Sequence, residues 1–170
     1  KERGIDAGIA IDKAVFPGLQ GGPHDNQTAA IAVSLKETAS SDFKIYGRQI
    51  VKNAKALAKG LQKRGLQLVS SGTDNHLMLI DVTPLGISGR EAQDLLERVG
   101  VVVNRNTIPY DTRSPFDPSG IRLGTPALTT RGMKEKEMQE VAQIIADTLT
   151  GGTIRQIMRR VHILCRRFPL

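Results

Sequence analysis

A long amphipathic stretch that ends at a glycine constrains the fold of this chain more than any other feature. Apolar residues recur at helical spacing between Ile50 and Leu61, and Gly65 occupies the position where a left-handed residue closes a helix. The pattern predicts a helix over about 43–64. Because one stripe of this helix is apolar, the helix has to pack against a core formed by the rest of the chain.

The residues that follow predict a hairpin and a second helix. Segments 67–70 and 76–82 have the composition of strands and are separated by the turn-forming residues 71–74. Ser88 followed by Glu91 is the signature of a capping box. We expect a helix that begins there and ends at Gly100.

The last part of the chain predicts two further strands and two helices. The strands are expected at 101–103 and 121–124, and Thr129 or Thr130 is expected to cap a helix that the glycine pair 151–152 stops. A basic amphipathic helix then closes the chain. This order of elements predicts an α+β domain, with a mostly antiparallel sheet and helices packed on one face.

The net charge of +7 is concentrated near the C-terminal end. Residues 151–170 contain five arginines and no acidic residue, and apolar residues recur among them at helical spacing. We interpret these arginines as the solvent-exposed face of a helix that docks on the core. RNA or DNA binding by this segment is the alternative, although aromatic residues, which would stack on bases, make up only 4% of the chain.

The composition also argues against several classes of protein. The single cysteine, Cys165, leaves no disulfide framework and no Cys and His cluster with metal-ligand spacing, so no metal site is predicted. We expect a soluble cytoplasmic protein, because the sequence contains neither a signal segment nor an apolar run long enough to span a membrane. A Schiff base would need a lysine in a desolvated pocket, and none of the lysines here has such surroundings in the sequence.

A glycine-rich loop in the first part of the chain predicts a close approach of the backbone to another group. Residues 15–23 read VFPGLQGGP and precede an alanine-rich segment at about 26–38. Because glycine has no side chain, the amides of Gly21 and Gly22 would be able to point at a phosphate near the start of the following helix. A tight turn required for packing is the alternative interpretation.

Arg122 is the best single candidate for a binding residue. The polar, proline-punctuated stretch 104–132 delivers it on a short strand-like segment, where we expect its two apolar neighbours to hold it partly out of water. There its rigid fork would bind a carboxylate through two parallel hydrogen bonds. A structural arginine that pairs with Asp111 or Asp117 is the alternative.

Five motifs occur in a fixed order along the chain. They are VFPGLQGGP, SSGTDNHLMLIDV, the polar stretch that begins at Asn104, GIRLGTPALTTRG and LCRRFPL. Together, from about Ala10 onward, they closely resemble the C-terminal part of the serine hydroxymethyltransferase family. The resemblance implies a fold-type I pyridoxal phosphate enzyme, active as a homodimer or higher oligomer. Such an enzyme moves the hydroxymethyl carbon of serine to tetrahydrofolate and yields glycine and methylenetetrahydrofolate.

The resemblance also implies roles for individual residues. Arg122 matches the arginine that binds the carboxylate of serine or glycine. Gly21 and Gly22 match the loop that reaches the cofactor phosphate of the neighbouring subunit, and Phe16 matches an aromatic residue that touches folate across the dimer interface. The other folate contacts that the resemblance implies are Asn106, Ser114, Pro115 and Phe116.

The lysine motif that forms the Schiff base in this family has no match in the chain. By resemblance, residues 1–40 are the end of the large pyridoxal phosphate domain with the interdomain helix, and residues 41–170 are the small C-terminal domain. We therefore expect part of a serine hydroxymethyltransferase that supplies binding groups and is inactive unless the N-terminal part complements it. The alternative is a derived, non-catalytic domain that acts as a partner-binding module.

Overall fold

The chain divides into two compact units, Lys1–Phe43 and Lys44–Leu170, in a computed structural model that describes residues 6–169. Helix α3 (Ser41–Gln62) begins in the first unit and continues into the second. The domain boundary expected between residues 40 and 41 stays a prediction. Residues 1–5 and 170 of the two predicted domains lie outside the described residues.

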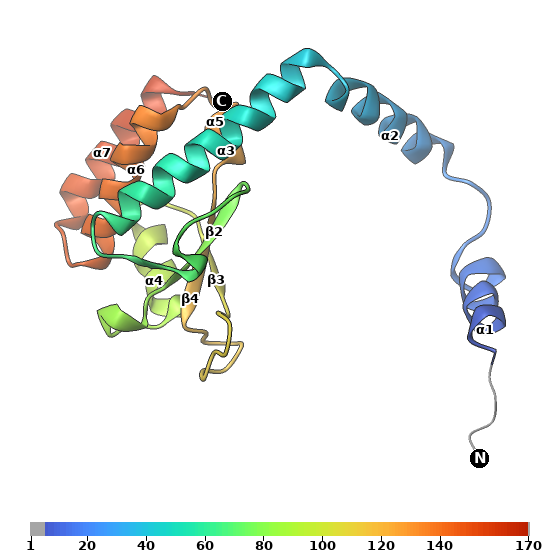
Figure 1. Cartoon of the computed structure of the whole chain (residues 1–170), viewed down its shortest axis with the longest axis horizontal. Coiled ribbons are helices and arrows are strands. Elements are labelled where there is room, and N and C mark those ends of the chain that lie inside the picture. The colour runs from blue at the N-terminus through green and yellow to red at the C-terminus, as the bar shows by residue number, and fades with distance from the viewer. Residues whose placement is uncertain (1–5, 170) are drawn as a thin grey trace. The chain divides into compact units, whose positions relative to one another are not determined.

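The described residues of the first unit form helical segments without a buried core. It contains α1 (Ala7–Lys13), the irregular turn η1 (Ala14–Leu19) and α2 (Asp25–Thr38), which are drawn in blue in Figure 1. None of the residues in these elements is buried, and the large apolar side chains of Phe16 and Leu19 are exposed. The helix predicted after the glycine-rich loop is confirmed as α2.

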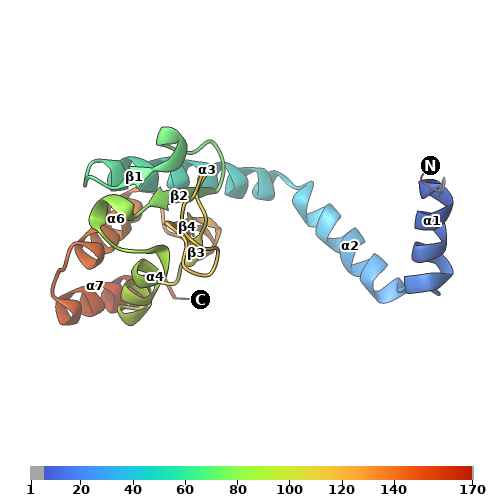
Figure 2. The same cartoon turned by 90° about the horizontal axis from the view of Figure 1, so that it is seen from below.

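The second unit is an α+β domain that contains most of the chain (Figures 1 and 2). Besides α3, its elements are β1 (Gln67–Leu68), η2 (Val69–Ser71), β2 (Leu77–Asp81), η3 (Thr83–Leu85), α4 (Gly89–Arg98), β3 (Asn104–Asn106), β4 (Gly120–Gly124), α5 (Pro126–Thr130), α6 (Glu135–Leu149) and α7 (Ile154–Arg167). Helix α3 confirms the long helix predicted over about 43–64, with ends that differ by two residues. The capping box of α4 is also confirmed, because Ser88 and Glu91 bond to each other's backbone amides.

The four strands form one sheet in the order β1-β2-β4-β3, and each neighbouring pair is antiparallel. Alternate residues of β2 and β4 are buried, among them Met78, Ile80, Ile121 and Leu123, and they belong to the core that the helices complete. Figure 1 shows α6 and α7 together on one side of the strands. The predicted fold class is therefore confirmed: the sheet is antiparallel and one of its faces carries the helices.

The strand predicted at 101–103 is wrong, because β3 begins only at Asn104. The amide of Val101 donates to the carbonyl of Leu96 over 2.9 Å, so the first residue of the apolar run closes the turn that follows α4 and does not pair with the sheet. Sheet pairing starts where Asn104 lies opposite Arg122. Helix termination and register, rather than β propensity, set the start of this strand.

The predicted helix start at Thr129 or Thr130 is also wrong. Thr129 is buried inside α5, and its hydroxyl donates to the carbonyl of Thr125 over 2.8 Å instead of capping a helix. Gly132 follows with a φ of 89°, in the left-handed region that interrupts a helix. The long helix therefore begins afresh at Glu135 as α6.

The hairpin is confirmed, but its first strand is shorter than predicted. Gln67 pairs with Asp81 and Leu68 pairs with Ile80. The chain leaves the extended conformation at η2, where Ser70 has a φ of 62°. Strand β1 therefore ends before the predicted residues 69–70.

The terminal helix docks on the core as expected. Ile157 and Leu164 of α7 are buried, whereas Arg155, Arg159 and Arg166 are exposed. Arg160 pairs with Asp147 of α6 over 2.7 Å. The basic residues therefore lie mainly on the solvent-exposed side of an amphipathic helix, as the periodicity predicted.

Candidate functional site

Arg122 lies in the middle of β4, on the face of the sheet opposite the core. Its strand neighbours Ile121 and Leu123 are buried, whereas the Arg122 side chain is exposed. The expectation that these neighbours would hold it partly out of water is therefore wrong. Successive side chains of a strand point to opposite faces, so the two apolar neighbours shield the core and leave the arginine uncovered.

The structural alternative for Arg122 is also wrong. Asp117 pairs with Arg113, and Asp111 accepts hydrogen bonds from the residues of its own loop. Within residues 6–169, no hydrogen bond or ion pair engages the guanidinium of Arg122. All the donors of its planar fork are thus available to an anion that approaches this face.

The sheet register places Asn106 beside Arg122. Asn104 of β3 lies directly opposite Arg122 of β4. Asn106 is the next β3 residue on the same face and lies opposite Gly120. Such diagonal neighbours lie roughly 7–8 Å apart, close enough for one small ligand to touch both side chains. On the other side of Arg122, Leu79 of β2 is its direct partner.

A hollow of about 330 Å³ lies beside the start of β2. It is lined by residues of the turn between Val69 and Asn75 and by the start of β2, including Leu79. Leu79 lies opposite Arg122 in the sheet, but Arg122 does not line the hollow. The sequence did not single out Leu79 or Asn104. The alternation in LMLID and GIRLG is the signal that would have placed Leu79 and Arg122 on one face.

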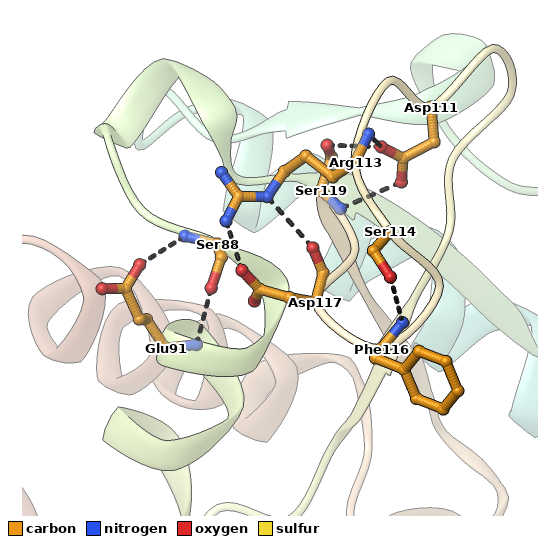
Figure 3. A network of polar contacts seen from close by, with 8 residues as sticks. All are labelled: Ser88, Glu91, Asp111, Arg113, Ser114, Phe116, Asp117 and Ser119. Atoms are coloured by element: carbon orange, nitrogen blue, oxygen red, sulfur yellow. Dashed lines mark hydrogen bonds and ion pairs between the residues drawn. The ribbon is translucent and has the colours of Figure 1, made fainter.

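The loop that joins β3 to β4 is closed by one carboxylate, that of Asp111 (Figure 3). Its Oδ2 accepts from the amides of Ile108, over 3.2 Å, and Ser119, over 2.9 Å. Its Oδ1 accepts from the amide of Arg113 over 2.9 Å and from the hydroxyl of Ser119 over 2.6 Å. Both ends of the loop are therefore attached to a single side chain.

A second set of polar contacts, around Arg113, Asp117 and Pro118, shapes the same loop and attaches it to α4. The guanidinium of Arg113 pairs with the carboxylate of Asp117 and donates from Nε to the Asp117 carbonyl over 3.0 Å. Nearby, the amide of Gly89 donates to the carbonyl of Pro118 over 2.7 Å. Figure 3 shows Asp117 beside Ser88, the residue that caps α4. The loop is therefore held at the start of that helix.

Both carboxyls of the loop have lowered pKa values. The hydroxyl and the amide of Ser119 are the main reasons that the pKa of Asp111 lies well below its ordinary value of 3.8. The pKa of Asp117 is lowered first by the Ser88 hydroxyl and then by Arg113. One oxygen of Asp117, Oδ1, is buried without a partner in good hydrogen-bond geometry, although Ser88 lies close enough to influence the carboxyl.

The predicted folate contacts Ser114, Pro115 and Phe116 lie between these two attachments. All three residues are exposed, and the Phe116 ring is 80% exposed. The hydroxyl of Ser114 accepts from the Phe116 amide over 3.3 Å and shapes the bend (Figure 3). At the other end of the loop, Tyr110 is fully exposed with a φ of 59°. The loop thus presents two aromatic rings to solvent.

The remaining predicted residues, Phe16, Gly21 and Gly22, belong to the first unit and are exposed there. A Cβ added to Gly21 or Gly22 would meet no atom within 4 Å, and neither residue has a positive φ. Within the described chain, neither amide donates a hydrogen bond. Packing within the described chain therefore does not require these glycines, so the tight-turn interpretation gains no support.

Three features are absent from residues 6–169 of the chain: a lysine in a desolvated pocket, a metal-binding cluster and a membrane-spanning helix. Every described lysine side chain is exposed to solvent. No group of three His, Cys, Asp or Glu side chains among these residues is placed to hold a metal ion. No helix in the described part of the chain is long and apolar enough to cross a membrane.

Comparison with known proteins identifies the class of protein to which this sheet and loop belong. The family model described as serine hydroxymethyltransferase matches residues 1–145. A serine hydroxymethyltransferase of Sorangium cellulosum (strain So ce56) is 54% identical over 167 residues, which cover 94% of this chain and 39% of the relative. The chain therefore belongs to the serine hydroxymethyltransferase family, and it spans about two fifths of the length of that relative.

Proposed function

We propose that this chain supplies the substrate-binding and folate-binding groups of a pyridoxal phosphate-dependent glycine hydroxymethyltransferase. The observation that carries the proposal is the uncommitted guanidinium of Arg122 on the open face of the sheet, diagonal to Asn106. Arg122 binds the carboxylate of serine or glycine in this proposal. A charge-assisted pair of parallel bonds would also fix the orientation of the amino acid.

Asn106, Ser114, Pro115 and Phe116 contact tetrahydrofolate in this proposal. An exposed ring on a fastened loop suits a planar aromatic co-substrate, since aromatic rings stack with little loss of conformational freedom. The Asn106 side-chain nitrogen donates to the Thr107 carbonyl over 2.7 Å, which leaves its second N–H and its oxygen to bind a ligand beside the arginine. The two groups of residues would thus bring the amino acid and the one-carbon acceptor together.

Gly21, Gly22 and Phe16 belong to a second contact region in the proposal. The free amides of the two glycines, just before the start of α2, bind the phosphate of the cofactor held by a neighbouring subunit. Phe16 touches folate across the same dimer interface. When bound, pyridoxal phosphate supplies the electron sink for bond cleavage at the amino acid's carbon atoms. The cytoplasm is the proposed location, on the basis of family membership.

The Schiff-base lysine is supplied from outside this chain in our proposal. The test is a chimaera in which this chain replaces the matching segment of the Sorangium cellulosum relative. We expect the chimaera to form glycine from serine only when tetrahydrofolate is present. The chain alone, mixed with pyridoxal phosphate, should give no stoichiometric absorbance band of lysine-bound cofactor. An inactive but folded chimaera would favour a non-catalytic, partner-binding module, and a stoichiometric band from the chain alone would contradict the assignment of the lysine.

A further inference from the structure

The carboxylate of Asp111 is placed to control where the β3–β4 loop lies. It accepts hydrogen bonds from backbone amides at both ends of the loop, Ile108 and Ser119, and from Arg113 between them. The Ser119 hydroxyl adds a further bond of 2.6 Å. One side chain therefore closes the loop, and its four accepted bonds use both carboxylate oxygens.

The segment between Ile108 and Ser119 has few other contacts that fix its position. Phe116 is 80% exposed and Tyr110 is fully exposed, so neither ring is anchored in the core. Ser114 contributes only local bonds: its hydroxyl accepts from the Phe116 amide, and its carbonyl accepts from the Asp117 amide over 2.9 Å. The position of Phe116 therefore depends on the polar attachments at Asp111 and at the Arg113–Asp117 pair (Figure 3).

We propose that Asp111 is a positioning residue for the folate co-substrate, acting through the loop that carries Ser114 and Phe116. The proposal rests on the function proposed above. A loop fixed before the co-substrate arrives loses less conformational entropy on binding, and affinity rises accordingly. Arg122 lies on β4 and is fixed by sheet pairing, so amino-acid binding should depend much less on Asp111.

Asp111→Asn is the informative substitution. An amide has one acceptor oxygen, so its NH₂ group would face backbone N–H donors whichever way it turns: the amide of Arg113 in one orientation, and the amides of Ile108 and Ser119 in the other. Ser119→Ala is the milder variant, because it removes only the hydroxyl bond to Oδ1 and leaves the amide bond intact. Asp94→Asn is the matched control, since Asp94 is an exposed carboxylate on α4 outside the loop.

The experiment measures steady-state kinetics of the chimaera with each variant. For Asp111→Asn we expect the KM for tetrahydrofolate to rise about 10-fold or more, while the KM for serine and the cofactor affinity stay within about 2-fold. Ser119→Ala should give a smaller rise, and Asp94→Asn none. The rise should be constant from about pH 6 to 9, because a carboxylate that acts by geometry does not titrate there.

A second measurement follows the loop in the 170-residue chain itself. Amide hydrogen exchange at Ile108, Arg113 and Ser119 should be faster by about 10-fold or more in Asp111→Asn than in Asp94→Asn. Unchanged exchange would overturn the proposal, and so would equal rises in both KM values, which indicate a general structural role. If the unsubstituted chimaera is inactive, the proposed function fails and this proposal falls with it. If that chimaera is active and Asp111→Asn leaves the folate KM unchanged, only the positioning role is refuted.

Discussion

Arg122 and Asn106 project from the same open face of the sheet as diagonal neighbours on β4 and β3, because Asn104 pairs with Arg122 and Asn106 pairs with Gly120. Fifteen residues lie between the two in the sequence, and only the antiparallel register brings them together. The loop between them carries the exposed Phe116. One short hairpin therefore holds the proposed groups for the amino acid and for folate.

Replacing Arg122 should weaken binding of the amino acid while leaving the cofactor in place. Loss of two charge-assisted hydrogen bonds, each worth about 1.5–3 kcal/mol, predicts a rise in the serine KM of about 100-fold or more for Arg122→Ala in the chimaera. Arg122→Lys should recover only part of this loss, because an ammonium lacks the planar fork. Titration with pyridoxal phosphate and serine separates the two affinities. Arg98→Ala, at an exposed position on α4, is the control, and an equal loss of both affinities would make Arg122 structural.

Asn53 should be essential for the stability of the second unit. It is 0% exposed, and its amide group donates to the Thr129 hydroxyl and to the Met133 carbonyl, each over 2.9 Å. Asn53→Leu leaves the buried carbonyl unsatisfied, and we expect a loss of about 2 kcal/mol or more in the free energy of unfolding. Urea denaturation measures it. Lys52→Ala, at the exposed neighbouring position, should change stability by less than about 0.5 kcal/mol.

Alanine substitutions at two glycines, Gly89 and Gly47, should change the stability of the fold in opposite directions. A Cβ on Gly89 would overlap the carbonyl oxygen of Gly120, so Gly89→Ala has to push α4 away from β4, at a cost of about 1–3 kcal/mol or more. A Cβ on Gly47 in α3 would meet no atom within 4 Å. Gly47→Ala should therefore stabilise the helix by about 0.5–1 kcal/mol. Thermal melting of both variants checks the pair, and a neutral Gly89→Ala would refute the close approach.

The contribution of Asp111 to stability should disappear in acid. Its pKa is lowered from the ordinary 3.8 in the folded chain, chiefly by the Ser119 hydroxyl. Because the folded state prefers the ionised form, the stabilisation is present above about pH 4 and is lost as the pH falls toward the folded pKa. The stability difference between the wild-type chain and Asp111→Asn should therefore be constant above about pH 5 and shrink toward about pH 2. Denaturation across this range measures it, and a difference that grows in acid would contradict the assignment.

The sequence by itself determined the elements whose signals are local. The apolar stripe from Ile50 to Leu61 predicts α3, and the Ser88–Glu91 capping box predicts the start of α4. Helical periodicity and capping depend on residues within a turn or two of each other, so they can be read along the chain. The ordered motifs were long enough to indicate the family, which the comparisons confirm.

The tertiary structure alone decided which residues share a face and which groups pair. No local pattern in the sequence indicates that β3 starts at Asn104 rather than at 101, or that Asp117 pairs with Arg113. No sequence pattern indicates that the Asp111 carboxylate closes the loop between β3 and β4. These features depend on strand register and loop closure, and a shift of one residue moves every side chain of a strand to the other face. The open face with its uncommitted arginine is therefore a property of the folded sheet.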